Sequence, residues 1–113
     1  MFDSKCIFLT DASAISAAET YMSWVKNNHL GIIVGDTTAG TNGTITMVQL
    51  PVMNFLYTGQ YVVSAEGTYR NKVGIPPDVR ITPTLAGIKE GRDEVLEHAI
   101  ELMQEMIDGP GKQ

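Results

Sequence analysis

A serine at the start of a predicted helix is the residue of this sequence best suited to chemistry. Residues 5–10 form an apolar run, and Ser16 begins a helix predicted over 16–27. The first amides of a helix have no intrahelical acceptors. They can donate to the negative oxygen of a tetrahedral intermediate, and the helix dipole assists them. Ser16 is therefore a candidate nucleophile, with the Ala17 N–H as a donor of the oxyanion hole.

The same serine also has a purely structural explanation. A serine at a helix N-terminus commonly caps the free amides of the first turn, and Ser13 is an equally good cap. No glycine flanks Ser16 in the Gly-x-Ser-x-Gly spacing of the α/β-hydrolase elbow. Local chemistry alone leaves open whether Ser16 is a nucleophile or a helix cap.

The segments around Ser16 predict one α/β unit. The apolar run 5–10 predicts a strand that is buried on both faces, as in a parallel sheet. The helix 16–27 and a second buried strand over 32–34 complete a strand–helix–strand crossover. The glycine-rich segment 35–43 predicts a loop, which lacks the lysine and the spacing of a phosphate-binding loop.

The second half of the chain predicts further strands and a closing helix. Pro51 ends an alternating strand over 44–50, and Thr58-Gly59 predicts a hairpin turn between strands 53–57 and 60–65. A short strand follows over 79–81. One apolar stripe at helical spacing lies between Asp93 and Asp108 and predicts the last helix.

Composition excludes several classes of function. The chain has 113 residues, enough for one domain over 1–113, and its net charge is −5 without a basic cluster, which argues against nucleic-acid partners. No apolar run approaches the roughly 20 residues that span a bilayer. Cys6 lies in an apolar run, which predicts a buried structural thiol. Two histidines without paired cysteines do not predict a zinc site.

Three ordered motifs resemble the C-terminal-processing (tail-specific, tricorn-core-like) serine peptidases. The string Ser-Ala-Ile-Ser-Ala-Ala-Glu at 13–19 is similar to their nucleophile motif, with Ser16 at the nucleophile position. Residues 31–40 resemble their strand and Gly-x-x-Thr-x-Gly loop, and residues 73–79 resemble their Gly-Ile/Val-x-Pro-Asp signature. Together the motifs extend over about residues 6–103, with the ending at 91–100 similar to the family's final helix.

This resemblance implies a fold and an activity. The fold would be a fragment of a crotonase/ClpP-like α/β core, and the activity would be cleavage of protein substrates near their C-termini. Gly40 and Thr41 would line the substrate cleft. The resemblance implies no metal or organic cofactor, and family members often act outside the cytoplasm, in the periplasm for example. The chain would be the C-terminal part of a peptidase domain, without the PDZ domain that often accompanies it.

Two positions depart from the family pattern. Many members use a lysine directly after the last glycine of the Gly-x-x-Thr-x-Gly loop, and Thr41 stands there instead. The tricorn-like branch uses an upstream histidine and a supporting glutamate, and Asn71 stands at the aligned glutamate position. Glu66 is the nearest acid upstream of it and is a candidate for that role. The base is therefore expected from a part that precedes this sequence, so that the chain alone would be inactive.

The chain's own histidines are poorly placed to serve as the base. His29 follows the first predicted helix at the end opposite Ser16. Twelve helical residues span roughly 18 Å, which puts His29 beyond hydrogen-bond reach. His98 lies within the last predicted helix, where a solvent-facing side chain is expected.

Three other interpretations stay open. One is a non-catalytic module that binds peptides or other ligands on the same fold, which Thr41 and Asn71 favour. A crotonase-like acyl-thioester enzyme would share that fold as well. Finally, a strand such as 5–10 without its sheet partners would expose apolar edges, which predicts self-association or domain swapping.

Overall fold

A three-stranded parallel sheet forms the centre of the computed structural model, which describes residues 4–64, 67, 69 and 71–109. Its strands are β1 (Ile7–Thr10), β2 (Ile32–Gly35) and β5 (Val79–Arg80), in the order β1-β2-β5. β1 pairs with β2 along its whole length, and β5 pairs with the last two residues of β2. The predicted parallel strand–helix–strand unit is therefore confirmed.

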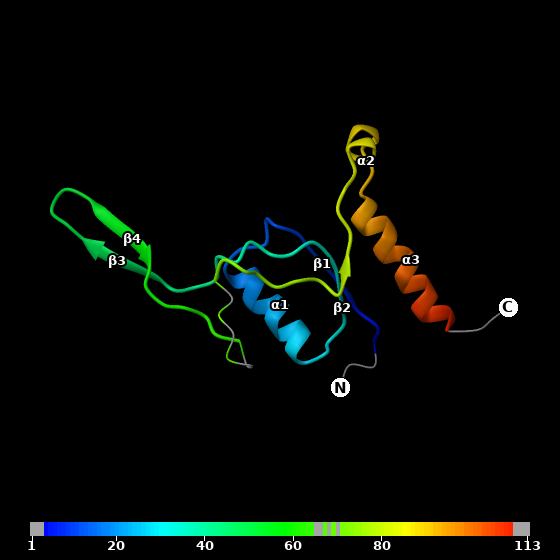
Figure 1. The fold of residues 1–113 in the computed structure, drawn as a ribbon, viewed down its shortest axis with the longest axis horizontal. Coiled ribbons are helices and arrows are strands. Elements are labelled where there is room, and N and C mark those ends of the chain that lie inside the picture. Colours follow the sequence, from blue (N-terminus) through cyan, green and yellow to red (C-terminus); the bar gives the residue numbers. More distant parts are fainter. Residues whose placement is uncertain (1–3, 65–66, 68, 70, 110–113) are drawn as a thin grey trace.

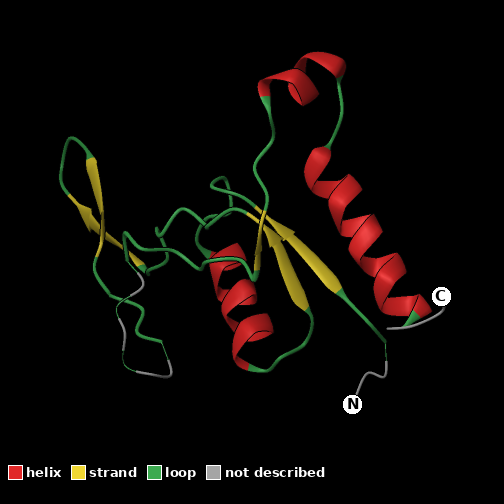
Figure 2. Ribbon diagram, turned by 45° about the vertical axis from the view of Figure 1, so that its right-hand side comes forward, coloured by secondary structure: helices red, strands yellow, loops and turns green. Residues whose placement is uncertain are grey.

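Two helices cover this sheet. Figure 2 shows the sheet between α1 (Ala17–Asn27) and α3 (Glu94–Asp108). The central strand β2 carries the core, because Ile33 and Val34 are fully buried. The apolar stripe predicted for the last helix faces this sheet only in part, since Ala99 is buried while Ile100 is 60% exposed. The molecule is thus a mixed α/β structure, as the sequence predicted. No helix in the described part of the chain is long and apolar enough to cross a membrane.

The prediction that the first strand is buried on both faces is wrong. β1 is an edge strand of the sheet, and Leu9 within it is 43% exposed. Cys6, just before β1, is half-buried rather than buried. An apolar run cannot reveal whether its strand will find neighbours on both sides, because that depends on the rest of the sheet.

The predicted hairpin around Thr58-Gly59 is also wrong. The strands that pair are β3 (Ile45–Gln49) and β4 (Asn54–Thr58), antiparallel and in register from Ile45 opposite Thr58. Their turn is closed by the Leu50 N–H, which donates to the Met53 carbonyl oxygen over 2.9 Å. Pro51 has the fixed φ that suits the second position of such a turn. It therefore joins two strands instead of only ending one.

The β3–β4 hairpin projects away from the rest of the molecule (Figure 1). Every residue of β4 is exposed, and apolar side chains of the hairpin such as Met53 and Phe55 are 60% and 57% exposed. The molecule measures 70 × 40 × 21 Å with a radius of gyration of 18.0 Å. A compact domain of this length has a radius of gyration of about 13 Å, so the chain encloses little core for its size.

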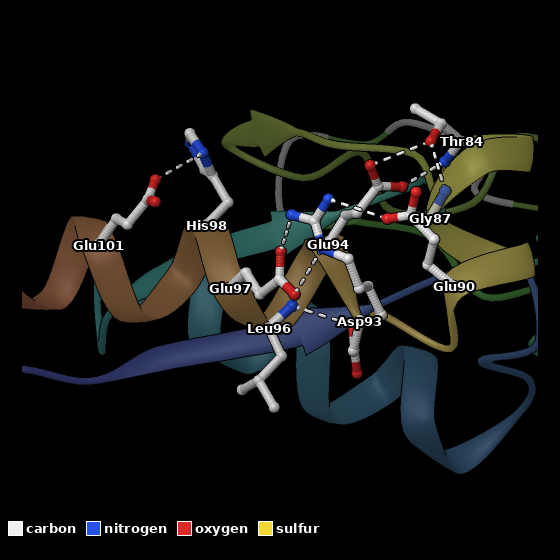
Figure 3. A network of polar contacts seen from close by, with 10 residues as sticks. Thr84, Gly87, Glu90, Asp93, Glu94, Leu96, Glu97, His98 and Glu101 are labelled. Atoms are coloured by element: carbon white, nitrogen blue, oxygen red, sulfur yellow. Dashed lines mark hydrogen bonds and ion pairs between the residues drawn. The ribbon is translucent and has the colours of Figure 1, made fainter.

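A short helix, α2 (Leu85–Glu90), was not predicted and is fixed by polar contacts at both ends (Figure 3). The Thr84 hydroxyl accepts from the Gly87 N–H at the start of α2, and Glu94 at the start of α3 accepts from the N–H and hydroxyl of Thr84. Arg92 between the helices donates to Glu97. These contacts define the corner through which the chain returns to the sheet.

Candidate active site

Ser16 lies where the chain turns from the end of β1 into α1, and its backbone is strained. Its φ of 51° and ψ of −114° belong to a region that non-glycine residues rarely adopt. A strained strand-to-helix turn is also the setting of the nucleophile in α/β hydrolases, where it exposes the serine hydroxyl. Ser16 is exposed here as well.

The groups around Ser16 do not behave as those of an ordinary helix cap. The Ser16 side chain has the arrangement of a capping box with Glu19, but it makes no capping hydrogen bond of ordinary geometry. The Glu19 N–H donates instead to the Ser16 carbonyl oxygen over 3.0 Å. The Ala17 N–H makes no hydrogen bond with any residue that the structure describes. A free amide thus lies directly beside the exposed serine.

Ser13, the other candidate cap, has a different role. Its N–H and its hydroxyl both donate to the Asp11 carboxylate, which closes a turn between β1 and Ser16. The hydrogen bond from the Ser13 hydroxyl, followed by that from its N–H, lowers the pKa of Asp11 below its ordinary value. This turn lines a groove of about 560 Å³ that also includes Leu9, Ile81 and Val95. Ser16 is not among the residues lining this groove.

The most buried polar side chain near Ser16 is Glu19, with 2% of its surface exposed. Its Oε1 accepts from the Thr38 hydroxyl and the Gly40 N–H, both over 2.7 Å. Its Oε2 accepts from the Thr41 N–H over 2.8 Å, and from the Thr41 hydroxyl and the Ser16 N–H over 3.2 Å each. The carboxylate therefore joins the start of α1 to the loop after β2.

Two opposing effects act on the Glu19 carboxyl. Burial raises its pKa, because a low-dielectric surrounding disfavours the charged form. The hydrogen bonds from Thr38, Gly40 and Thr41 lower the pKa by more, because they stabilise the carboxylate. The net pKa lies below the ordinary value of 4.5, so Glu19 is ionised at neutral pH.

A third segment, at 72–75, lies against the same loop. The Lys72 N–H donates to the Gly40 carbonyl oxygen over 2.7 Å, and the Thr38 N–H donates to the Ile75 carbonyl oxygen over 3.2 Å. The Ile75 N–H donates to the Thr38 hydroxyl over 2.8 Å. The structure therefore brings together parts of all three motifs that the sequence singled out.

The other predicted site residues have different surroundings. The N–H groups of Gly40 and Thr41 are occupied by Glu19, so a substrate contact there would use other groups. Asn71 is half-buried, and Glu66 lies outside the described residues. His29 follows α1 at the end away from Ser16, and His98 on α3 lies 3.8 Å from Glu101 with 44% of its side chain exposed.

Sequence reasoning included Glu19 in a motif but gave it no function. The available signal was its position three residues after Ser16, the spacing of a capping box. That spacing predicts a contact with the Ser16 N–H and nothing about the loop 38–41. Within the described residues, no group of three or more His, Cys, Asp and Glu side chains could hold a metal ion.

Comparison with known proteins relates this arrangement to one family. The family model of peptidase family S41 matches residues 1–81, more than half of the chain. The chain belongs to peptidase family S41. The resemblance to C-terminal-processing peptidases that the three motifs predicted is thereby confirmed, and the chain is a piece of a protease fold.

Solved structures and two curated relatives are similar to this S41 chain over most of its length. Mature CPAF is 25% identical with a TM-score of 0.87, covering 98% of this chain and 22% of CPAF. The tricorn protease has a TM-score of 0.86 at 21% identity, over 94% of this chain and 11% of its own, and shares the fold. The photosystem II D1 C-terminal processing protease is 28% identical with a TM-score of 0.54, over 65% and 19% of the two chains.

The two curated relatives are much longer than this S41 chain. A protein of Chlamydia trachomatis serovar D is 26% identical over 111 residues, which are 94% of this chain and 18% of that protein. A second chlamydial relative has the same identity and the same 18% share. The chain therefore spans about a fifth of the length of the curated relatives that it matches.

Proposed function

We propose that this chain is the C-terminal part of an S41 serine peptidase domain with a crotonase/ClpP-like core, and that Ser16 is its nucleophile. The domain would cleave protein substrates near their C-termini. The observation that carries the proposal is the strained, exposed Ser16 at the start of α1, directly before an N–H without a partner among the described residues. Strained backbone persists mainly where function requires it and the surroundings enforce it.

The proposed reaction uses few groups of this chain. The Ser16 Oγ attacks the scissile carbonyl carbon while its proton passes to a base, and the carbonyl oxygen becomes negative. The Ala17 N–H donates a hydrogen bond to that oxygen, a stabilisation that counts most in the transition state. When the tetrahedral intermediate collapses, the peptide C–N bond breaks, and the base returns the proton to the leaving amine.

The base in this proposal comes from outside the chain. Thr41 stands where many family members have a lysine, and its hydroxyl donates to Glu19. A threonine hydroxyl does not titrate near neutral pH and cannot replace a desolvated lysine. We assign the base to an upstream histidine, with Glu66 as a candidate supporting acid. The chain alone is then inactive.

The test is labelling with a fluorophosphonate probe, which reacts with activated serines. The probe is applied to this chain and to a longer form that includes the upstream peptidase residues, each beside its Ser16→Ala variant. Labelling of the longer form alone, lost in Ser16→Ala, is the expected result. Labelling of this chain by itself would contradict the external base, and no Ser16-dependent label on either folded form would contradict the nucleophile.

A non-catalytic binding module is the second candidate, and one observation favours it. Both the N–H and the hydroxyl of Thr41 are held by Glu19, so this position supports the fold and supplies no base. Such a module would keep the cleft and bind peptides without cleaving them. Peptide binding by the longer form without any Ser16-dependent labelling would establish it in place of the peptidase.

We also propose that the isolated chain associates with itself through the β3–β4 hairpin. The segment 37–65 contains no Asp, Glu, Lys, Arg or His, so no charge opposes its contact with another apolar surface. The accessible surface is 8480 Å², whereas a compact monomer of 12.3 kDa exposes about 6,100 Å². The difference exceeds the roughly 800 Å² per partner of a standard interface.

Sedimentation equilibrium over a range of concentrations measures this association. Phe55→Asp, in β4, is expected to weaken self-association at least about tenfold, because a charge would enter the buried apolar contact. Leu85→Asp is the matched control, because Leu85 is 79% exposed on α2 and lies outside the hairpin. A wild-type chain that stays monomeric at all concentrations would contradict this proposal.

A further inference from the structure

A buried carboxylate held only by neutral donors is the least expected feature of the described structure. A charge is costly to bury unless hydrogen bonds or opposite charges replace its water. Glu19 is 2% exposed, and each hydrogen bond that its carboxylate accepts from the described residues comes from a backbone N–H or a threonine hydroxyl. Such an arrangement persists only if the negative charge is used to hold these donors in place.

The donors come from two segments that are far apart in the sequence. One is the strained turn at Ser16, and the other is the loop 38–41. Thr38 extends the contact to a third segment, because its hydroxyl also accepts from the Ile75 N–H. We propose that Glu19 is the positioning residue of this site, which holds the loop 38–41 against the nucleophile turn and fixes the backbone of Ser16.

Glu19 is unsuited to be the base itself. Its two oxygens accept five hydrogen bonds, which fill the roughly four lone-pair positions of a carboxylate. Its contact with Ser16 is to the backbone N–H and not to the hydroxyl. The same hydrogen bonds outweigh burial and lower its pKa, whereas an effective base has a pKa near the working pH. Glu19 therefore acts through the backbone that it holds.

Hydrogen bonds hold the strained Ser16 backbone on both sides, at its N–H and at its carbonyl oxygen. Its N–H donates to the Glu19 carboxylate, and its carbonyl oxygen accepts from the N–H groups of Glu19 and Thr20 over 3.0 and 3.3 Å. The Ala39 N–H, next to Thr38, donates to the Ala14 carbonyl oxygen just before the turn. Without the carboxylate, two hydrogen bonds would remain between this part of the chain and the start of α1: the one to Ala14 and the one from the Asn42 amide to the Thr20 hydroxyl.

Residue-resolved amide hydrogen exchange of the chain at neutral pH tests this role. In Glu19→Gln, one side-chain oxygen is replaced by an NH₂ group, which would face donors instead of accepting from them. The N–H groups of Gly40 and Thr41 are then expected to lose protection at least about tenfold, since hydrogen bonds to charged groups are among the strongest. The Ile33 N–H, which donates to Asp78, is the internal reference and keeps its protection.

Glu101→Gln is the matched control variant, because it makes the same chemical change at an exposed residue of α3. Unchanged protection of Gly40 and Thr41 in Glu19→Gln, as in Glu101→Gln, would overturn the proposal. An equal loss at Gly40, Thr41 and Ile33 would also overturn it, because Glu19 would then stabilise the whole fold and position nothing in particular.

The pH profile separates the charge from the shape of the side chain. Because the pKa of Glu19 is lowered by folding, its contribution is complete above the ordinary carboxyl value of 4.5 and is lost as the pH falls through the lower folded value. Protection of Gly40 and Thr41 is therefore expected to fall with acidification in the wild type, relative to that of Val34, which is fully buried in β2 and pairs with β1. Ile33 is not the reference here, because its N–H donates to Asp78, whose pKa is also lowered. In Glu19→Gln the relative protection should not depend on pH in this range, and a parallel fall there would contradict the inference.

A milder pair of variants decides the matter if Glu19→Gln does not fold. Thr38→Val removes one donor to Glu19 and the acceptor of the Ile75 N–H at nearly constant volume, whereas Thr38→Ser keeps the hydroxyl. Lower protection at Gly40 in Thr38→Val, restored in Thr38→Ser, is the expected result, and equal protection in both would overturn the proposal. The positioning role of Glu19 rests on the proposed nucleophile Ser16, but hydrogen exchange is measured without any peptide cleavage. Failure of Ser16 labelling would therefore leave this result intact.

Discussion

Replacement of Gly74 by alanine is expected to lower the free energy of unfolding by about 3 kcal/mol or more. Gly74 is buried in the segment that lies against the loop 38–41, and its φ is 74°. A side chain in this left-handed region costs about 1–2 kcal/mol by itself. A Cβ at Gly74 would also lie 2.2 Å from the Thr38 carbonyl oxygen, so the backbone of one segment would have to move.

Gly91→Ala is a control that isolates the second effect. Gly91 ends α2 with a φ of 69°, nearly the same as Gly74, but a Cβ there would meet no atom within 4 Å. Its replacement is therefore expected to cost only about 1 kcal/mol, the strain of the backbone conformation. Urea denaturation of both variants measures the difference. Equal losses would mean that the clash at Thr38 is relieved without cost.

The strand–helix–strand unit was predictable because its signals are local. The apolar run before Ser16, the helical spacing that follows and the buried strand at 32–34 each depend on neighbouring residues only. The structure places β1, α1 and β2 within a few residues of these predictions. The edge position of β1 was not predictable, because it depends on which strands lie beside it.

The hairpin was predicted wrongly and the short helix α2 was not predicted, and the reason differs from that for β1. Pro51 and Thr58-Gly59 are both credible turn signals, and the sequence does not say which of two apolar runs pairs across which turn. The structure resolves the choice in favour of Pro51, with β3 and β4 pairing over five residues each. Helix α2 has six residues and depends on its caps, Thr84 and Gly91, rather than on an apolar stripe.

The candidate site was predictable in its parts but not in its connections. Ser16, the loop with Gly40 and Thr41, and the segment at 73–79 were each found as separate motifs. The Glu19 carboxylate joins the Ser16 N–H to the loop, and its partners in the loop are 19 to 22 residues away in the sequence. No periodicity or spacing signals a hydrogen bond over such a separation, so this residue became visible only in three dimensions.

The aspartate of the 73–79 motif is expected to matter for stability through one hydrogen bond. Asp78 accepts from the N–H of the fully buried Ile33 over 2.9 Å, and its other oxygen lies 3.1 Å from the Lys26 Nζ. Asp78→Ala is expected to lower the free energy of unfolding by about 2 kcal/mol, because it leaves the Ile33 N–H without its acceptor. Urea denaturation at neutral pH measures the loss.

Two further variants separate the hydrogen bond from the ion pair. Asp78→Asn can keep an oxygen for the Ile33 N–H, but it loses the charge and the acceptor of the Lys26 Nζ. Lys26→Met removes the partner cation together with its hydrogen bond to the Pro76 carbonyl oxygen. The Asp78 side chain is 41% and the Lys26 side chain 32% exposed, so solvent screens their attraction and each variant should cost less than about 1 kcal/mol. An Asp78→Asn variant as unstable as Asp78→Ala would show that the charge matters more than the hydrogen bond.

The pH dependence of stability in these variants gives a second test of whether the hydrogen bond or the charge of Asp78 matters more. Burial raises the pKa of Asp78, but the hydrogen bond from Ile33 and the contacts with Lys26 and His29 lower the pKa by more. The net pKa therefore lies below its ordinary value of 3.8. The contribution of the charge is thus complete above 3.8 and lost as the pH falls through the lower folded value. The stability difference between wild type and Asp78→Asn should therefore shrink on acidification. A difference that stays constant would assign Asp78 a role independent of its charge. In that case its hydrogen bond alone would hold the segment 72–78 against β2. That bond would still keep Gly74 and Ile75 beside the loop that contacts the candidate nucleophile turn.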